Sequence, residues 1–187
     1  MKIKLALDVE DYLFYHLYRA SQSPTLKKRR LRNWILVPAV YFISGVLLLL
    51  LKGSEMISMI FFVTGALWVF LYPLYSKWAI PRYMRRQIAE KYSGIIGKEG
   101  SIEIRDQKEI KDQKIRLSGN GQSEEIKISD LTNILEFPGY YIIELTNGPG
   151  LILPKNKIPE EKINDLIEKI SGQSGIAINN RLRWDWK

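Results

Sequence analysis

Few side chains in this sequence are of a type that does catalytic or metal chemistry. The 187 residues include no cysteine and one histidine, His16. Disulfides, thiolate metal sites and a cysteine nucleophile are therefore excluded, and one chain cannot hold zinc with two histidine ligands. No recognisable motif pairs His16 with a nucleophile or an orienting acid, so we interpret it as a partly buried or interfacial side chain. We expect no catalytic residue, no metal and no cofactor.

Two acidic pairs and one glycine-rich segment resemble known sites only superficially. Glu124-Glu125 and Glu160-Glu161 are adjacent in the sequence, so each pair points apart on a strand or shares the first turn of a helix, unlike a catalytic carboxylate pair. The segment GIIGKEGS, residues 94–101, lacks the spacing and the Ser or Thr of a phosphate-binding loop. We interpret that segment as a hinge, and an enzyme acting on lipid is the least favoured hypothesis.

The informative charged side chains are nine lysines and arginines in two clusters. They flank two long apolar runs, one cluster before the first run and one after the second: Lys27, Lys28, Arg29, Arg30 and Arg32, then Lys77, Arg82, Arg85 and Arg86. Basic side chains beside a membrane span attract anionic lipid headgroups, by about 1 kcal/mol each near the surface. We expect these residues to contact anionic lipids or, as the simpler alternative, only to set the orientation of the spans.

The elements that carry these clusters are two uncharged runs, residues 34–51 and 56–76. At about 1.5 Å per helical residue, the runs are about 27 and 31 Å long, which matches a hydrocarbon core of about 30 Å. Neither run has the polar stripe of a soluble amphipathic helix. The four residues 52–55 between them can only turn the chain back, so we expect a transmembrane hairpin over residues 34–76.

The charges that flank this hairpin predict its orientation. Lys and Arg in short flanks remain on the cytoplasmic side of a membrane, and both basic clusters lie at the outer ends of the two runs. We therefore expect both termini in the cytoplasm and the hairpin in a bacterial inner membrane. Trp34, Tyr75 and Trp78 lie at the same boundary, where aromatic rings settle.

Inside the two runs there is no Asp, Glu, Lys, Arg or His, which argues against a pump or transporter. Gly45 and Gly65 favour close packing, either of the two helices on each other or, as the alternative, in a homo-oligomer. An oligomeric pore lined by serine and threonine side chains stays open. Pro38 is expected in the first turn of its helix and Pro73 near the end of the other.

Residues 1–33 are predicted to form a strand, an amphipathic helix and the basic run. MKIKLAL alternates apolar and polar residues, which is typical of a strand. Asp8 is a helix cap supported by Asp11, and residues 9–22 have one apolar face. Because a lone strand cannot bury its apolar face, we expect residues 2–7 to pair with the C-terminal sheet.

The chain after the hairpin divides into two segments. Residues 77–100 are predicted to be a juxtamembrane helix followed by the glycine hinge. Residues 101–187 change to a period of two, which indicates antiparallel strands with one solvated face. We expect six strands up to residue 154 and a helix from Pro159 to about residue 171. This last segment is slightly acidic, which argues against nucleic acid as a partner.

Several of these segments are similar to the YcxB-like family of bacterial membrane proteins. The family pattern is a strand entering a short turn, an aromatic-rich strand, and an Ile/Leu-Pro-Lys step before a helix. The matching residues here are Ile128–Ile134, Tyr140–Leu145 and Leu153-Pro154-Lys155. Many members have Trp at the position of Ile128. The resemblance implies a pleckstrin-homology-like (PH-like) domain, a bent antiparallel barrel capped by a C-terminal helix, and it implies no catalytic residue or cofactor.

Two features of this region keep two interpretations each. Lys155 either faces water after Pro154 ends its strand, or it contacts a ligand. The tail has Leu182, Trp184 and Trp186 at a period of two, so it is either an extra strand or an anchor at the membrane interface.

Together these observations predict an α+β membrane protein with a two-helix transmembrane hairpin and an antiparallel PH-like domain capped by a C-terminal helix. The leading hypothesis is a non-enzymatic inner-membrane protein whose cytoplasmic domain binds an unidentified protein or a lipid near the membrane. The alternative is a homo-oligomeric small channel or a stress-related membrane component. We expect the lipid bilayer, with its anionic headgroups, as a partner, and no nucleic acid.

Overall fold

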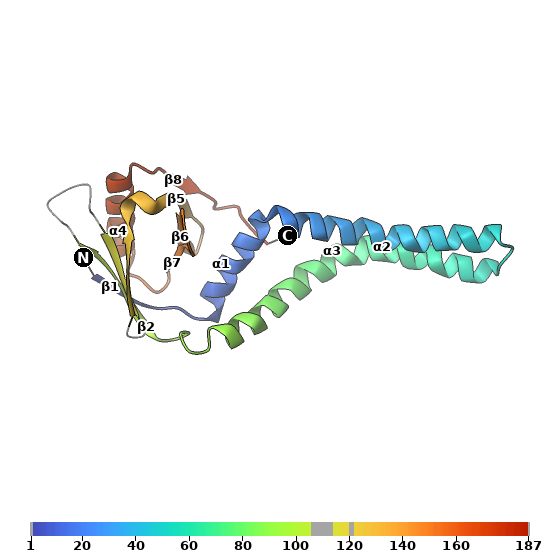
Figure 1. The fold of residues 1–187 in the computed structure, drawn as a ribbon, viewed down its shortest axis with the longest axis horizontal. Helices are drawn as coiled ribbons and strands as arrows, with labels where there is room; N and C mark the ends of the chain where they lie inside the picture. Colours follow the sequence, from blue (N-terminus) through green and yellow to red (C-terminus); the bar gives the residue numbers. More distant parts are fainter. Residues whose placement is uncertain (1, 106–113, 120–121, 187) are drawn as a thin grey trace. The chain divides into compact units, whose positions relative to one another are not determined.

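A computed structural model describes residues 2–105, 114–119 and 122–186 of the chain (Figure 1). It contains two compact units. The sheet unit comprises Met1–Tyr15 and Arg85–Asp185, and the hairpin unit comprises His16–Met84 and Trp186–Lys187. In chain order the helices and strands are β1 (Lys2–Ala6), α1 (Val9–Gln22), α2 (Pro24–Leu50), α3 (Glu55–Lys91), β2 (Glu99–Arg105), β3 (Lys114–Gly119), β4 (Gln122–Lys127), the 3₁₀ turn η2 (Ile128–Asp130), β5 (Leu131–Glu136), β6 (Tyr140–Leu145), β7 (Leu151–Pro154), α4 (Glu160–Ser174) and β8 (Ile178–Asn180).

Two long apolar helices, α2 and α3, form the hairpin unit and lie side by side (Figure 1). Each is long and apolar enough to cross a membrane. A β-carbon added at Gly45 would lie 2.8 Å from Phe62 Cε1, and one added at Gly65 would lie 3.3 Å from Phe42 Cε2. Both glycines therefore face the other helix of the hairpin, which confirms the expected packing of the two helices on each other.

Both helices are longer than the apolar runs that predict them, so two expectations about proline were wrong. α2 begins at Pro24, a residue suited to a first turn, and Pro38 consequently lies in the helix interior. α3 continues to Lys91, so Pro73 is interior too, and the expected juxtamembrane helix is the last part of α3. The flanks stay helical because Lys, Arg, Gln and Met favour helix about as strongly as the apolar residues do.

The sheet unit contains two four-stranded sheets. One has the strand order β1-β2-β3-β4 and is antiparallel; the other has the order β7-β6-β5-β8. The six strands expected before residue 154 are β2 to β7. β1 pairs with β2, with Ile3 opposite Ile102 and Leu5 opposite Gly100. The expected pairing of the N-terminal strand with the C-terminal sheet is therefore confirmed.

One hydrophobic cluster joins both sheets, η2 and α4. β1 contributes Ile3 and Leu5 to it, and α4 contributes its expected apolar stripe, Ile163, Leu166, Ile167 and Ile170. α4 ends at Gly175, whose φ of 71° provides the left-handed cap that terminates the helix. Because the first strand and the last helix of the chain both fill this core, the sheet unit is built from both ends of the sequence.

The C-terminal tail contains a strand, but not where its alternating pattern predicts one. β8 pairs in parallel with β5, with Ile178 opposite Ile134, whereas residues 181–186 lie outside any strand. The Trp184 ring lies edge-on to Phe14 and to Phe137, at centroid distances of 5.3 and 5.7 Å. The strand interpretation of the tail from Leu182 onward was wrong, because Trp184 packs through aromatic edges instead of entering a strand ladder.

Candidate functional site

The nine basic residues expected at the lipid headgroups all lie on helices. The first cluster occupies the first three turns of α2, and the second lies on α3 after residue 76: Lys27, Lys28, Arg29, Arg30 and Arg32, then Lys77, Arg82, Arg85 and Arg86. Eight of the nine are exposed and Arg30 is half-buried. Arg30 Nε on α2 donates a hydrogen bond to Ser76 Oγ on α3 at 3.1 Å. The α2 cluster and the segment around Ser76 therefore share one end of the hairpin unit.

That end of the hairpin unit carries no acidic residue. Between residues 16 and 84 the sequence has a single Asp or Glu, Glu55, which begins α3 at the opposite end of the hairpin. Along the apolar length between the two ends, side chains such as Ile43 and Phe70 are exposed. Uncompensated positive charge beside exposed apolar helices is suited to the headgroup layer of an anionic membrane.

Two of the basic residues on α3 have local partners. Arg82 Cζ lies 3.7 Å from the centroid of the Trp78 ring, a cation–π contact one helical turn apart. In the sheet unit, Arg85 Nη2 lies 2.8 Å from Glu10 Oε1. Both members of that ion pair are more than half exposed, so it contributes at most about 1 kcal/mol. Neither partner occupies Arg82 or Arg85 strongly, and lipid contact stays a prediction for both.

The sheet unit has a polar pocket of about 420 Å³ beside the end of β7 and the start of α4. Its lining residues are Glu136, Tyr141, Lys155, Glu160, Ile163 and Asn164. Lys155 Nζ lies 2.7 Å from Glu136 Oε1 and 4.4 Å from the centroid of the Tyr141 ring. The Tyr141 hydroxyl donates to the same Glu136 oxygen at 3.0 Å. Lys155 therefore lines a pocket as half of an ion pair, and its contact with a ligand stays a prediction.

The pocket is not arranged for acid–base catalysis near neutral pH. The hydrogen bond from Lys155 lowers the pKa of Glu136 even though partial burial opposes this. Burial, and next the hydrogen bond to Glu136, raise the pKa of Tyr141 to about 12. Glu136 is thus charged and Tyr141 neutral at pH 7, whereas a general acid or base works best with a pKa near the working pH. The pocket is suited to binding.

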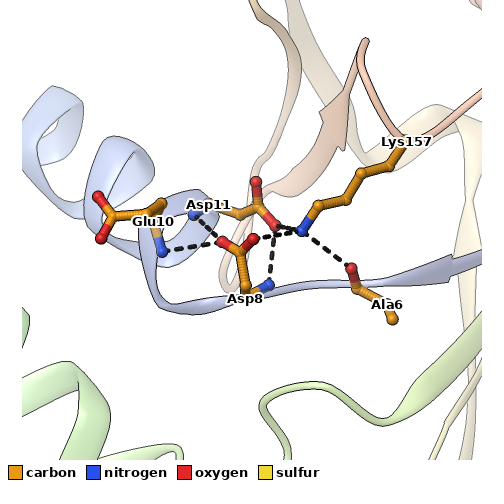
Figure 2. Close-up of polar contacts among 5 residues, drawn as sticks. All are labelled: Ala6, Asp8, Glu10, Asp11 and Lys157. Atoms are coloured by element: carbon orange, nitrogen blue, oxygen red, sulfur yellow. Dashed lines mark hydrogen bonds and ion pairs between the residues drawn. The ribbon is translucent and has the colours of Figure 1, made fainter.

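A second polar cluster joins the start of α1 to the loop before α4 (Figure 2). Lys157 Nζ lies 2.6 Å from Asp11 Oδ2 and 2.7 Å from Asp8 Oδ2, and it donates to the Ala6 carbonyl oxygen at 3.2 Å. Asp8 Oδ1 accepts hydrogen bonds from the Glu10 and Asp11 backbone N–H groups, at 2.9 and 3.0 Å. Asp8 N–H donates in return to Asp11 Oδ2 at 2.8 Å. Asp8 is the helix cap that the sequence predicts, and Asp11 supports it.

The charges of this cluster are fixed and fully paired. Asp11 is 2% exposed and also accepts a hydrogen bond from the Tyr140 hydroxyl; burial, and then Asp11, raise the pKa of Tyr140 to about 12. Burial would lower the pKa of Lys157, but hydrogen bonds to Asp11 and Asp8 outweigh it and raise that pKa. Burial would raise the pKa of Asp8, but the bond from Lys157 and the helix N–H groups lower it. Since an ammonium group has three N–H donors and Lys157 has three acceptors, the cluster is a structural clasp.

The sequence pattern does not single out Ser76, Glu136 or Lys157. Each acquires its partner through a contact between segments that are far apart in the chain, which periodicity does not report. The usable signal is the Leu153-Pro154-Lys155 step, because it places Lys155 and Lys157 on either side of one exposed turn. In residues 2–105, 114–119 and 122–186, no group of three His, Cys, Asp or Glu side chains is arranged to hold a metal ion.

Comparison with known proteins bears on one segment of the chain. No curated protein and no solved structure matches it. Residues 110–170 match the family described as YcxB-like protein. The matched segment includes the pocket residues Glu136, Tyr141 and Lys155, and also Lys157 of the clasp. The expected resemblance is thereby confirmed: residues 110–170 of this chain are a YcxB-like segment.

Proposed function

We propose that this protein is a non-enzymatic integral protein of a bacterial inner membrane, whose cytoplasmic PH-like domain binds a protein or lipid partner close to the bilayer. The α2–α3 hairpin is the membrane anchor, and both termini lie in the cytoplasm. The observation that carries the proposal is the hairpin unit, in which two long apolar helices are exposed along their length and basic residues gather at one end without any acidic residue.

Exposure of the apolar side chains supports the anchor. In each helix only 11% of the most apolar eighteen-residue window is buried. A core helix of a soluble protein buries its apolar face, and soluble proteins rarely expose large continuous apolar patches. The hydrocarbon core of a bilayer is the solvent that suits such helices. The basic end then lies in the cytoplasmic headgroup layer.

The order of elements in the sheet unit supports a PH-like domain. Such a domain has seven antiparallel strands in two sheets and a capping helix, and the segment after residue 99 supplies six strands before α4. β1 is the seventh strand, and it pairs with β2 from the other end of the chain. α4 buries its apolar stripe on the common core. The hairpin is then an insertion between the first and second strands of this domain.

The polar pocket is the place where we expect the partner to bind. Lys155, Glu136 and Tyr141 present charge and an aromatic hydroxyl beside the exposed first turns of α4. The test is a photo-crosslinking amino acid placed at Asn164, which lines the pocket, in cells. A matched control places it at Asp165, the next residue, which does not line the pocket. We expect a discrete adduct from position 164 that is absent from position 165 and is lost when Lys155→Ala is added.

The adduct also identifies the partner class. A shift of tens of kilodaltons indicates a protein, a shift below about one kilodalton indicates a lipid, and a shift equal to the chain itself indicates a homo-oligomer. Equal patterns from positions 164 and 165, or no adduct from either, would remove the pocket from the proposal.

A pore remains the alternative with less support. The hydroxyl of Ser58 donates to the Ser54 carbonyl oxygen at 3.3 Å, and that of Thr64 donates to the Ile60 carbonyl oxygen at 2.8 Å. Both hydroxyl protons are therefore used within α3, and Ser58 is buried. A helix face with its hydroxyl protons engaged in this way is poorly suited to line an aqueous channel.

A further inference from the structure

The basic end of the hairpin unit contains one tertiary cluster that the lipid-anchor proposal does not use. Arg30, the single half-buried member of the nine basic residues, donates from Nε to Ser76 Oγ at 3.1 Å. The Trp186 ring lies under the same guanidinium, with Arg30 Cζ 5.2 Å from the ring centroid. Ser76 and Trp186 are 4% and 8% exposed. Three segments of the hairpin unit, two helices and the end of the chain, therefore meet at Arg30.

Two donors in this cluster lack an acceptor within the described parts of the chain. Trp186 Nε1 is buried and makes no hydrogen bond there. Arg30 uses Nε on Ser76 and has no carboxylate partner in the same described parts. Buried polar groups in proteins are almost always hydrogen-bonded. A buried indole N–H beside a guanidinium with spare N–H groups consequently points to an acceptor that this chain does not supply.

The charge around the cluster identifies that acceptor as an anion. Within residues 16–54 and 56–84 there is no Asp or Glu, and Lys27, Lys28 and Arg29 precede Arg30 directly. The planar guanidinium offers parallel N–H groups that match two oxygens of one phosphate. Glu55, the acidic residue of this unit, lies at the other end of the hairpin and cannot serve.

The surroundings indicate that the phosphate belongs to a lipid. Leu31 follows Arg30 on α2 and is 53% exposed, and Leu74 and Tyr75 precede Ser76 on α3 and are 67% and 61% exposed. An anion bound at Arg30 thus has exposed apolar side chains beside it on both helices, which suits acyl chains. We infer that Arg30, Ser76 and Trp186 form a binding site for the phosphate of a single membrane phospholipid. This inference rests on the proposed membrane anchor and names one lipid site within it.

The test uses the full-length protein, delipidated in a neutral detergent and titrated with phosphatidylglycerol, with bound lipids counted by native mass spectrometry. Trp186→Phe keeps an aromatic ring under Arg30 and removes only the N–H donor. Arg30→Gln removes the guanidinium, and Arg29→Gln is the matched control because it removes the same charge from the exposed neighbouring position. We expect one tightly held lipid in the natural protein. Arg30→Gln and Trp186→Phe should each weaken its binding about tenfold, and Arg29→Gln less than twofold.

Two results would overturn the site. If Arg29→Gln and Arg30→Gln weaken binding equally, the lipid responds only to overall charge. If Trp186→Phe binds as the natural protein does, the indole N–H has no part in recognition. Inorganic phosphate is the competing ligand: retention of phosphate with no preference for the lipid would assign the site to a free anion and reject the lipid. Arg30→Lys, which keeps the charge and lacks the fork, should resemble Arg30→Gln and guards against a folding defect.

Failure of this site is distinguishable from failure of the membrane anchor. Insertion and orientation of the hairpin are measured separately, by labelling of the turn between α2 and α3 in intact cells. A correctly inserted hairpin with no selective effect of Arg30 would reject the lipid site alone.

Discussion

Lys157 and Asp11 are 146 positions apart in the sequence, and Lys157 Nζ lies 2.6 Å from Asp11 Oδ2. The contact joins the first turn of α1 to the loop between β7 and α4 (Figure 2). Asp11 is almost completely buried, and its carboxylate also accepts hydrogen bonds from Asp8 N–H and from the Tyr140 hydroxyl. The N-terminal arm is thus held in the sheet unit by a buried charge as well as by the pairing of β1.

Replacing Lys157 by Met should destabilise the sheet unit by about 3 kcal/mol. The substitution leaves Asp11 buried without its cation, and breaking a buried ion pair typically costs about 3 to 5 kcal/mol; the lower value applies because a quarter of the Lys157 side chain is exposed. The thermal unfolding midpoint of the purified protein measures the effect. Lys162→Met, at an exposed position of α4, is the control, and an equal midpoint for both variants would contradict the account.

The clasp should also make stability depend on pH in acid. The pKa of Asp8 is lowered from 3.8 and that of Glu136 from 4.5, so each stabilises the fold above its unfolded pKa. This stabilisation is lost as the pH falls through the lower folded values, in the range below about pH 4.5. The pKa of Lys157 is raised above 10.5, so its contribution is present below that pH and is lost only above it. Unfolding midpoints between pH 3 and 7 should fall less steeply for Asp8→Asn than for the natural protein; parallel curves would exclude Asp8.

Removal of β1 should expose the edge of the sheet that contains it. Ile3 and Leu5 are buried in the common core, and β1 provides the backbone partners of β2. A chain that lacks residues 1–8 should be cleaved by protease within residues 99–145 well before the intact chain is. The control is Lys2→Gln with Lys4→Gln, which alters two exposed side chains of the same strand. A fragment of residues 101–187 that is monomeric and as protease-resistant as the intact protein would show that β1 is dispensable.

The elements that sequence periodicity predicts well are those that one local face defines. Residues 9–22 form α1 as expected, and the stripe from Ile163 to Ile170 fills the core, because period and burial agree there. The start of α2 is different. Apolarity marks the part of a helix that is suited to lipid, whereas Pro24 and the basic residues after it extend the helix without extending the apolar run.

The polar sites are less predictable for a physical reason. Asp11 is expected as a capping residue, yet its burial depends on Lys157 arriving from the other end of the chain. β8 has three residues and pairs in parallel with β5, so its existence depends on a tertiary contact and not on its own pattern. The nine basic residues are identifiable from charge alone, but the special position of Arg30 follows only from its contact with Ser76.

The packing of α2 on α3 should be sensitive to size at Gly45. A β-carbon there would lie 2.8 Å from Phe62 Cε1, so Gly45→Leu should push the helices apart and lower the unfolding midpoint of the hairpin in detergent. Ala66→Leu adds volume at an exposed position of α3 and should have little effect. In a double-mutant cycle, Phe62→Ala should offset part of the loss caused by Gly45→Leu. Additive losses would mean that the two residues do not face each other.

The most direct measurement of the central claim is the topology of the hairpin in intact cells. The natural chain has no cysteine, so single cysteines can be placed at Ser54 in the turn, at exposed Arg19 on α1, and at Gly172 on α4, where an added β-carbon has no neighbour within 4 Å. A membrane-impermeant maleimide should label position 54 in intact cells, and positions 19 and 172 only after the inner membrane is permeabilised. Labelling of position 19 or 172 in intact cells, or recovery of the protein in the soluble fraction, would contradict the proposed anchor.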